Sequence, residues 1–517
     1  MKSPNTTSLE PQPDLSPVRP DNSSAKVDRR FFLGSTAAAA ISLGVGAHIA
    51  PATLVQAPAS PVTHHPRPAP KARNVIFMVS DGMSFGTLTL ADMYCRLHER
   101  RESHWIAFMR RPGVRRGLFR TESLDSPVTD SAAAGSAWAC GHKVRNGSLN
   151  ITDDGVQRLP LLIQASQSGK AVGLVSTTRI THATPASFLA TVPRRDWEGL
   201  IARQMMTRGF DVALGGGSRF FPPSLLSEHP STNLIHTRAQ LLELDKLSAA
   251  DPARSQHPLL GLFADMHVPY VLDRDETIPS LADMTQCAIG RLRDRPNGFV
   301  LQVEGGRIDH AAHANDAPSL IAEQLDFDKA IKVVLDFAAD RDDTLVIITT
   351  DHGNANPGLT IYGKEAHAAL ARVPQAKHSF EWIKRQLSDL KSSDDRAAAA
   401  PALLEQAAGL SLSAEEKRFV QSAYNGQRTA PFMELASIEP VMGGVLANHF
   451  GIGFVSGNHT SDMVEVTAFG PGADTLPPVG HNADLHPMIE RALALEPGKL
   501  LDDMRDPVEF PKPPSND

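Results

Sequence analysis

Five continuous apolar segments, each ending in polar or glycine residues, constrain the fold of this chain more than any other feature. They run over residues 74–82, 171–178, 210–217, 298–306 and 344–353. Segments of this length and composition are typical of strands that are buried on both faces of a sheet. Helical patterns lie between them, for example over 199–209 and 319–339. The alternation predicts an α/β fold, with a mainly parallel central sheet flanked by helices on both faces.

Composition divides the 517-residue chain into further parts. We expect an export signal over 1–57, a proline-rich linker over 58–72, a catalytic domain over 73–495 and a tail over 496–517. Within the catalytic domain, residues 365–445 hold several amphipathic helical patterns and no strong apolar strand. This segment is predicted to be a helical insertion between elements of the sheet.

The N-terminal segment resembles a bacterial twin-arginine export signal. Arg29 and Arg30 are followed by Phe-Phe-Leu and then by a weakly apolar run that is rich in Ala and Gly. The run is short and weak for a membrane-spanning helix, which needs about 20 apolar residues. An uncleaved membrane anchor and a chance basic pair are the alternatives. The expected product is periplasmic or secreted, with no stable membrane span after processing.

Charge and cysteine content exclude other classes of protein. The net charge is −7 and no long basic run occurs, which argues against a nucleic-acid partner. Cys95, Cys140 and Cys287 are too few for a disulfide framework, and their spacing does not suit a metal site. We expect them to be small, buried side chains.

Acidic and histidine side chains follow the predicted strands. Because ligands bind at the carboxyl ends of strands in parallel sheets, these side chains are expected to converge. Asp309 and His313 are four residues apart, so on a helix they share one face. Imidazole and carboxylate groups together are the usual ligands of zinc and similar metals. The candidate ligands of a metal centre are Asp81, Glu304, Asp309, His310, His313, Asp351, His352 and His459.

A run of small residues over 128–141 opens on Asp130 and Ser131. One interpretation is a helix N-cap, since both residue types accept hydrogen bonds from unpaired backbone amides. The other is a nucleophile at a helix N-terminus, where an anionic substrate binds favourably. A metal centre favours the second interpretation, because a nearby zinc ion lowers the pKa of a hydroxyl group. Arg194 or Arg195 could bind the phosphate oxygens in a bidentate manner.

Six motifs, in this order along the chain, resemble those of the alkaline phosphatases. They are SDGMS, TDSAAAGSA, THATPASF, VEGGRIDHAAH, TTDHGN and GNHTSD, and the resemblance extends over about residues 73–490. It implies a phosphomonoesterase that forms a phosphoserine intermediate and acts on small-molecule phosphate monoesters. It also implies two zinc ions, one magnesium ion and a homodimer.

The resemblance also implies a role for each matching residue. Ser131 matches the nucleophile and Arg195 the phosphate clamp. The ligands of the zinc ion that binds the leaving-group oxygen would be Asp309, His313 and His459. Those of the zinc ion that activates the serine would be Asp81, Asp351 and His352. The magnesium ligands would be Asp81, Thr184 and Glu304.

Three neighbours of these residues would support the site without binding the substrate themselves: Asp130, His182 and His310. Enterobacterial members of the family have Asp and Lys where this chain has His182 and His310. The histidine pair therefore implies a lower affinity for magnesium and phosphate, and faster release of phosphate. Simple water-bonded histidines are the alternative.

Two other functions fit parts of the pattern. Phosphodiesterases and sulfatases of the same superfamily share the metal motifs, but the sequence around Ser131, together with Thr184 and Glu304, favours the monoesterase. An exported metal-binding or phosphate-binding protein with a silent site is the non-enzymatic alternative. A protein that only binds would not need Ser131.

Overall fold

The computed structural model describes residues 72–250, 257–427 and 430–505. These residues belong to one unit, Arg67–Asp517. The expected export signal, nearly all of the linker and the last residues of the tail lie outside the described residues.

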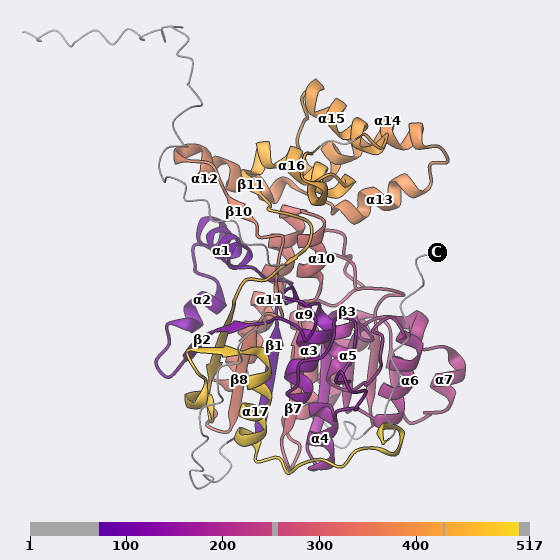
Figure 1. Ribbon diagram of the computed structural model, residues 1–517, viewed down its shortest axis with the longest axis vertical. Helices are drawn as coiled ribbons and strands as arrows, with labels where there is room; N and C mark the ends of the chain where they lie inside the picture. The colour runs from indigo at the N-terminus through magenta and orange to yellow at the C-terminus, as the bar shows by residue number, and fades with distance from the viewer. Residues whose placement is uncertain (1–71, 251–256, 428–429, 506–517) are drawn as a thin grey trace, which may run out of the picture. The chain divides into compact units, whose positions relative to one another are not determined.

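A mixed sheet of ten strands forms the centre of this unit (Figure 1). The strands follow the order β14-β2-β13-β8-β1-β7-β3-β4-β6-β5. Their bounds are β1 Asn74–Val79, β2 Arg115–Arg120, β3 Ala171–Arg179, β4 Val212–Gly216, β5 Asn233–Ile235, β6 Leu259–Leu262, β7 Phe299–Glu304, β8 Thr344–Thr349, β13 Val464–Phe469 and β14 Val479–His481. Neighbouring strands are parallel, except that β13 is antiparallel to both β8 and β2. The prediction of a mainly parallel α/β sheet is therefore confirmed.

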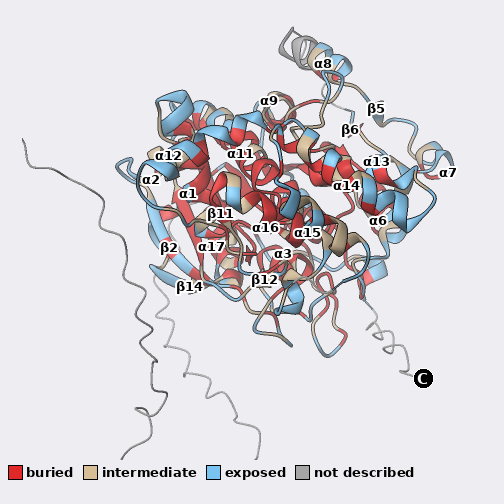
Figure 2. Ribbon diagram, turned by 90° about the horizontal axis from the view of Figure 1, so that it is seen from above, coloured by how far each residue is buried: buried red, intermediate tan, exposed pale blue. Residues whose placement is uncertain are grey.

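Each face of the sheet packs against its own apolar core, because side chains alternate along a strand. In β1, Val75 and Phe77 belong to one core, and Ile76 and Met78 belong to the other. The first core includes side chains of α3 Ser131–Cys140, α4 Leu161–Gln167, α5 Ala183–Ser187, α6 Glu198–Arg208, α7 Pro223–Ser227 and α17 Leu485–Leu493. The second includes side chains of α2 His104–Met109, α8 Arg238–Ala250, α9 Leu281–Leu292, α10 Arg307–His313 and α11 Ala317–Ala338. Buried residues accordingly fill the centre of the view in Figure 2.

Helix α3 is buried along its whole length. Its small side chains allow close packing against α5, and Gly135 marks the tightest point. A Cβ atom at Gly135 would lie 2.5 Å from Oγ of Ser187, which is closer than real Cβ atoms approach. The unusual run of small residues is thus explained by the position of this helix inside the protein.

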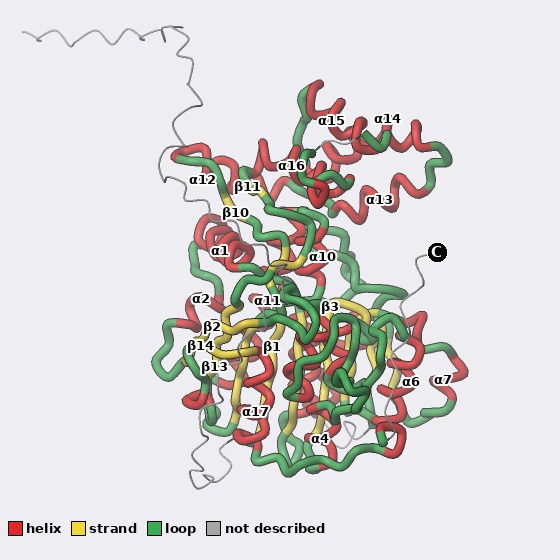
Figure 3. Tube along the Cα trace, viewed as in Figure 1, coloured by secondary structure: helices red, strands yellow, loops and turns green. Residues whose placement is uncertain are grey.

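Helices dominate the region of the expected insertion (Figure 3). They are α12 Gly363–Arg372, α13 Phe380–Ser388, α14 Ser393–Ala408, α15 Ala414–Tyr424 and α16 Ile438–Phe450. Apolar side chains of these helices form a third core together with residues of α1 Phe85–Tyr94 and α11. This core fixes the position of the helices relative to the segment that follows β1.

Short elements complete the described part of the chain. Two small antiparallel pairs join β9 Gly353–Asn354 to β12 His459–Thr460, and β10 Gly358–Leu359 to β11 Ile452–Gly453. Single turns of 3-10 or π-helix span Cys95–Glu99, Ser218–Phe220, Val373–Gln375, Met433–Leu435, Ala473–Thr475, Asn482–Asp484 and Asp502–Met504. Cys95, Cys140 and Cys287 are buried, as the sequence predicts. Among the described helices, none has the length and apolarity that crossing a membrane requires.

Candidate active site

Three neighbouring strands bring carboxylates together at one edge of the sheet. Asp81 lies two residues beyond the end of β1, Glu304 is the last residue of β7, and Asp351 lies two residues beyond the end of β8. Strand β1 pairs with both β7 and β8, and all pairs are parallel, so the three carboxyl ends coincide. All three side chains are fully buried. The convergence expected from the sequence is therefore present.

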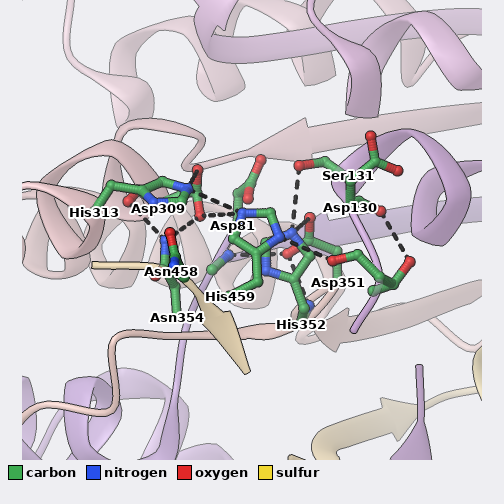
Figure 4. Close-up of polar contacts among 12 residues, drawn as sticks. Asp81, Asp130, Ser131, Asp309, His313, Asp351, His352, Asn354, Asn458 and His459 are labelled. Atoms are coloured by element: carbon green, nitrogen blue, oxygen red, sulfur yellow. Dashed lines mark hydrogen bonds and ion pairs between the residues drawn. The ribbon is translucent and has the colours of Figure 1, made fainter. Parts of the chain in front are cut away.

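Helix α10 and strand β12 supply the next group of side chains (Figure 4). Asp309 and His313 share one face of α10, and Nε2 of His313 lies 3.4 Å from Oδ2 of Asp309. His459 reaches the same place from β12, with its Nε2 3.5 Å from Oδ1 of Asp309 and 3.0 Å from Nε2 of His313. Gly82 allows α10 to approach β1, because a Cβ atom there would lie 2.5 Å from Oδ1 of Asp309.

Potential ligand atoms gather in three clusters within the described part of the chain. In each cluster the atoms lie within 4.8 Å of one another, as metal ligands do. The clusters are Asp81 with Asp351 and His352, Asp309 with His352 and His459, and Asp81 with His182 and Glu304. Thr184 adjoins the last cluster, with its Oγ1 3.4 Å from Oδ2 of Asp81. His313 adjoins the second cluster through the contacts given above.

The buried carboxylates of these clusters need nearby positive charge, which bound cations would supply. Burial, and then the charges of Asp351 and Asp309, raise the pKa of Asp81 well above its usual value. Burial raises the pKa of Glu304 to about 7. Oδ1 of Asp81 and Oε1 of Glu304 are buried, and no hydrogen-bond donor of the described residues reaches either atom. Because buried carboxylates without donors are costly unless a cation is present, these residues fit metal ions.

Ser131 stands beside the first of these clusters. It is the first residue of α3, it is buried, and its Oγ lies 3.4 Å from Nε2 of His352. Asp130 caps the helix, since its Oδ1 accepts a hydrogen bond from the backbone N–H of Ala133 at 2.9 Å. The capping interpretation therefore describes Asp130. It leaves the hydroxyl group of Ser131 directed at the candidate metal ligands.

The two adjacent arginines differ in their contacts. Arg195 donates from Nη1 to Oδ2 of Asp130 at 3.0 Å and from Nη2 to Nε2 of His182 at 2.9 Å. Arg194 instead forms an ion pair with Asp196, and both of these side chains are exposed. Of these two arginines, Arg195 is the one that contacts Asp130 and His182, and its role as the phosphate clamp stays a prediction.

The structure adds His267 to the histidines proposed from the sequence. The rings of His182, His267 and His310 form a group, with 4.3 Å between the centroids of His267 and His310 and 5.5 Å between those of His182 and His310. Arg179 contacts His267, and Arg307 donates from Nη1 to Nδ1 of His310 at 2.8 Å. No strand-end motif marks His267, so sequence reasoning did not single it out.

The fold and the site together define a class of protein. A mainly parallel sheet with metal-type clusters at its carboxyl edge, a serine beside them and an arginine nearby define a metal-dependent hydrolase that acts on phosphate esters. Residues 72–495 match the family model described as "Alkaline phosphatase". The chain therefore belongs to the alkaline phosphatase family.

Individual relatives agree with this assignment. Alkaline phosphatase 4 of Bacillus subtilis is 32% identical over 432 residues, which are 81% of this chain and 88% of that protein. The crystal structure of Thermus thermophilus alkaline phosphatase matches with a TM-score of 0.74 and 33% identity, covering 83% of this chain and 92% of that one. A cold-active alkaline phosphatase from Shewanella sp. matches with a TM-score of 0.68 and 26% identity, covering 81% and 99%. The chain is thus a metal-dependent phosphomonoesterase.

Proposed function

We propose that Ser131 is the nucleophile of this phosphomonoesterase and becomes a phosphoserine during turnover. One observation carries the proposal: Oγ of Ser131 lies 3.4 Å from Nε2 of His352, a member of two of the three metal-type clusters. The bond from Oγ to phosphorus forms as the bond from phosphorus to the ester oxygen breaks. The hydroxyl group of Ser131 loses its proton, the departing ester oxygen gains one, and the alcohol leaves. Water then cleaves the phosphoserine, which releases inorganic phosphate and restores the serine hydroxyl.

Arg195 is proposed to bind the phosphoryl oxygens. Its side chain is 27% exposed, and its guanidinium is held by Asp130, the residue that caps the helix of the nucleophile. A guanidinium group matches two oxygens of a phosphate in a bidentate manner. The N-terminus of α3 adds backbone amides that favour the same negative charge.

The metal assignment is also a proposal. Two zinc ions would be held by Asp309, His313 and His459, and by Asp81, Asp351 and His352. One magnesium ion would be held by Asp81, Thr184 and Glu304. When bound, these ions would supply positive charge to the attacking and leaving oxygens of the displacement. Nitrogen ligands suit zinc and oxygen ligands suit magnesium, although His182 also lies in the third cluster. Metal analysis of the purified protein tests the assignment.

The proposal also covers the location of the protein and its oligomeric state. The twin-arginine motif supports export to the periplasm or beyond, and the family resemblance supports a homodimer. Export is tested by mutating Arg29 and Arg30 to Lys and measuring the protein in periplasmic and medium fractions. The mass of the purified enzyme in solution tests the dimer.

The first experiment is the hydrolysis of p-nitrophenyl phosphate at alkaline pH, beside bis(p-nitrophenyl) phosphate. Both assays are run before and after chelation, and again after zinc and magnesium are restored. The proposal expects monoester turnover that chelation abolishes and metals restore. A preference for the diester would assign the phosphodiesterase function instead. Metal binding without turnover of either ester would indicate a binding protein.

A further inference from the structure

A polar pocket of about 270 Å³ adjoins the candidate site on the side of α10. His313 forms part of its wall together with the neighbouring His310, so the pocket borders one of the proposed zinc ligands directly. Helices α13 and α16 of the insertion complete the wall with Glu381, Lys384 and Glu439. None of these three residues belongs to one of the six sequence motifs.

The pocket lies on the His313 side of the candidate site, away from Ser131. Ser131 contacts His352, whereas the pocket borders His313. Figure 4 shows Ser131 and His313 at opposite ends of the row of site residues, with His459 between them. In an in-line displacement the leaving oxygen departs on the side opposite the attacking oxygen. The leaving group is therefore directed from Ser131 towards His313 and the pocket.

The inner side of the pocket is formed by Arg307, a buried cation that is paired with a carboxylate. The side chain of Arg307 is 3% exposed and forms an ion pair with Glu381. Its guanidinium lies 3.7 Å from the ring centroid of Tyr270 and donates to Nδ1 of His310 at 2.8 Å. Arg307 thus covers a face of Tyr270, so that face is not free to stack on a flat ring.

The rim of the pocket is a second matched pair. Lys384 of α13 forms an ion pair with Glu439 of α16, and their side chains are 56% and 20% exposed. In the ion pair described above, the side chain of Glu381 is 42% exposed. Each pair places donor and acceptor groups next to one another without an unmatched charge. Such groups suit hydroxyl groups, which both donate and accept hydrogen bonds.

We propose, on the basis of the function proposed above, that this pocket is the leaving-group subsite and that it selects uncharged, hydroxyl-rich alcohols such as sugars and polyols. A second phosphate or carboxylate on the substrate would need an unmatched cation, and Lys384 and Arg307 are both paired with carboxylates. An apolar or aromatic alcohol would displace water from the two ion pairs and offer no hydrogen bonds in its place, which costs free energy. The volume of the pocket accommodates a hexose or a smaller polyol.

This proposal can be tested by measuring how the phosphoenzyme divides between hydrolysis by water and phosphoryl transfer to added alcohols. An alcohol that takes the phosphoryl group from the phosphoserine occupies the place that the leaving group has vacated. We would load the enzyme with p-nitrophenyl phosphate as donor. We would then measure transfer to sorbitol, to n-butanol and to gluconate at equal concentrations, relative to hydrolysis. The donor is the same throughout, so the ratios report only on the acceptor.

The expected result is a clear preference for sorbitol over both other acceptors in the wild-type enzyme. The variants Lys384→Met and Glu439→Gln should each reduce the sorbitol-to-butanol ratio about tenfold, the effect of losing about 1.4 kcal/mol of hydrogen bonding. Lys417→Met is the matched control, because Lys417 pairs with Glu405 between α14 and α15 and does not line the pocket. It should leave the ratio as in the wild type.

Three results would overturn the proposal: equal transfer to sorbitol and butanol in the wild type, ratios in both pocket variants equal to that of Lys417→Met, or a preference for gluconate. The last of these would assign the pocket to anionic leaving groups. If p-nitrophenol is not released at all, the function proposed for Ser131 fails, and this outcome is distinct from the others. Using two pocket variants allows for one that does not fold.

Discussion

Asp130 holds the guanidinium group of Arg195, with 3.0 Å between Oδ2 and Nη1. The other oxygen of the same carboxylate caps the helix that begins at Ser131. One side chain therefore fixes both the helix of the proposed nucleophile and the proposed clamp for phosphate. The backbone N–H of Gly147 donates to Oδ2 of Asp130 as well, at 3.0 Å, which restrains the carboxylate further.

Replacement of the two neighbouring arginines should separate their roles. Arg195→Ala removes a bidentate contact to the phosphoryl group, so we expect kcat/KM for p-nitrophenyl phosphate to fall about a hundredfold, or about 2.7 kcal/mol. Arg194→Ala removes only an exposed ion pair with Asp196 and should change kcat/KM less than about twofold. Inhibition by phosphate, measured in the same assays, should weaken only in the Arg195 variant. Equal losses in both variants would contradict the assignment.

Two serines of α3 offer a similar comparison. Ser131→Ala should abolish turnover and leave phosphate binding measurable, because the arginine and the metal-type clusters remain. Ser136→Ala should retain turnover, since Ser136 accepts a hydrogen bond from the backbone N–H of Asn150 at 2.9 Å and is proposed only to support the structure. Isothermal titration with phosphate and steady-state kinetics measure both properties. Turnover in Ser131→Ala comparable to that of Ser136→Ala would remove Ser131 from the mechanism.

The histidine pair should control the affinity for product. Burial and the charge of Arg195 hold the pKa of His182 well below its usual value, and burial and His267 do the same for His310, so both rings are neutral. The double variant His182→Asp/His310→Lys adds an acidic ligand to one metal-type cluster and a cation beside it. We expect the inhibition constant for phosphate to fall about tenfold, equivalent to about 1.4 kcal/mol.

Steady-state inhibition by phosphate measures this change. His367→Lys, on the exposed surface of α12, is the control for the added charge. It should not alter the inhibition constant. The same constant in the double variant and in the wild type would favour the alternative of water-bonded histidines.

The sequence predicts the centre of this fold well. The strands β1, β7 and β8 are buried on both faces, so their apolar segments are continuous and their ends are marked by Asp81, Glu304 and Asp351. The proximity of Asp309 and His313 can also be predicted, because residues four apart on a helix lie on the same face. Local patterns therefore locate most of the residues that converge at the carboxyl edge.

Other parts depend on contacts between distant segments and leave no local pattern. Strand β2, Arg115–Arg120, buries only Gly117 and Phe119 and exposes its other side chains, so it lacks the continuous apolar segment that marks the central strands. His267 lies outside any strand-end motif, and it reaches His310 only through the fold. Glu381 and Lys384 belong to the insertion, where the sequence shows amphipathic helices but not the element against which they pack.

Removal of the metal ions should make stability depend on pH in a defined direction. The pKa of Glu304 is raised by burial to about 7, and burial, with the charges of Asp351 and Asp309, raises that of Asp81 well above its ordinary value. The charge of Asp309 raises the pKa of His313 to about 9, against the opposing effect of burial. Each of these groups binds more protons in the folded, metal-free protein than in the unfolded chain.

Stability falls with rising pH wherever the folded state binds more protons than the unfolded state. Between pH 7 and pH 9 the folded protein must release protons from Glu304 and His313, which the unfolded chain has already lost. Histidines with lowered pKa values, such as His182, are neutral in both states over this interval and do not contribute. The chelated protein is therefore expected to lose stability steadily from pH 7 to pH 9, by about 1.4 kcal/mol for each pKa unit that is titrated.

Bound metal ions should remove this dependence, because they bind the deprotonated carboxylates and neutral imidazoles. The zinc- and magnesium-loaded protein should keep its melting temperature over the same interval, so the difference between the two forms should widen as the pH rises. Thermal unfolding at pH 7, 8 and 9, with and without chelator, measures this difference. A constant difference would show that the buried carboxylates and His313 do not bind the ions, and it would contradict the proposed ligand sets.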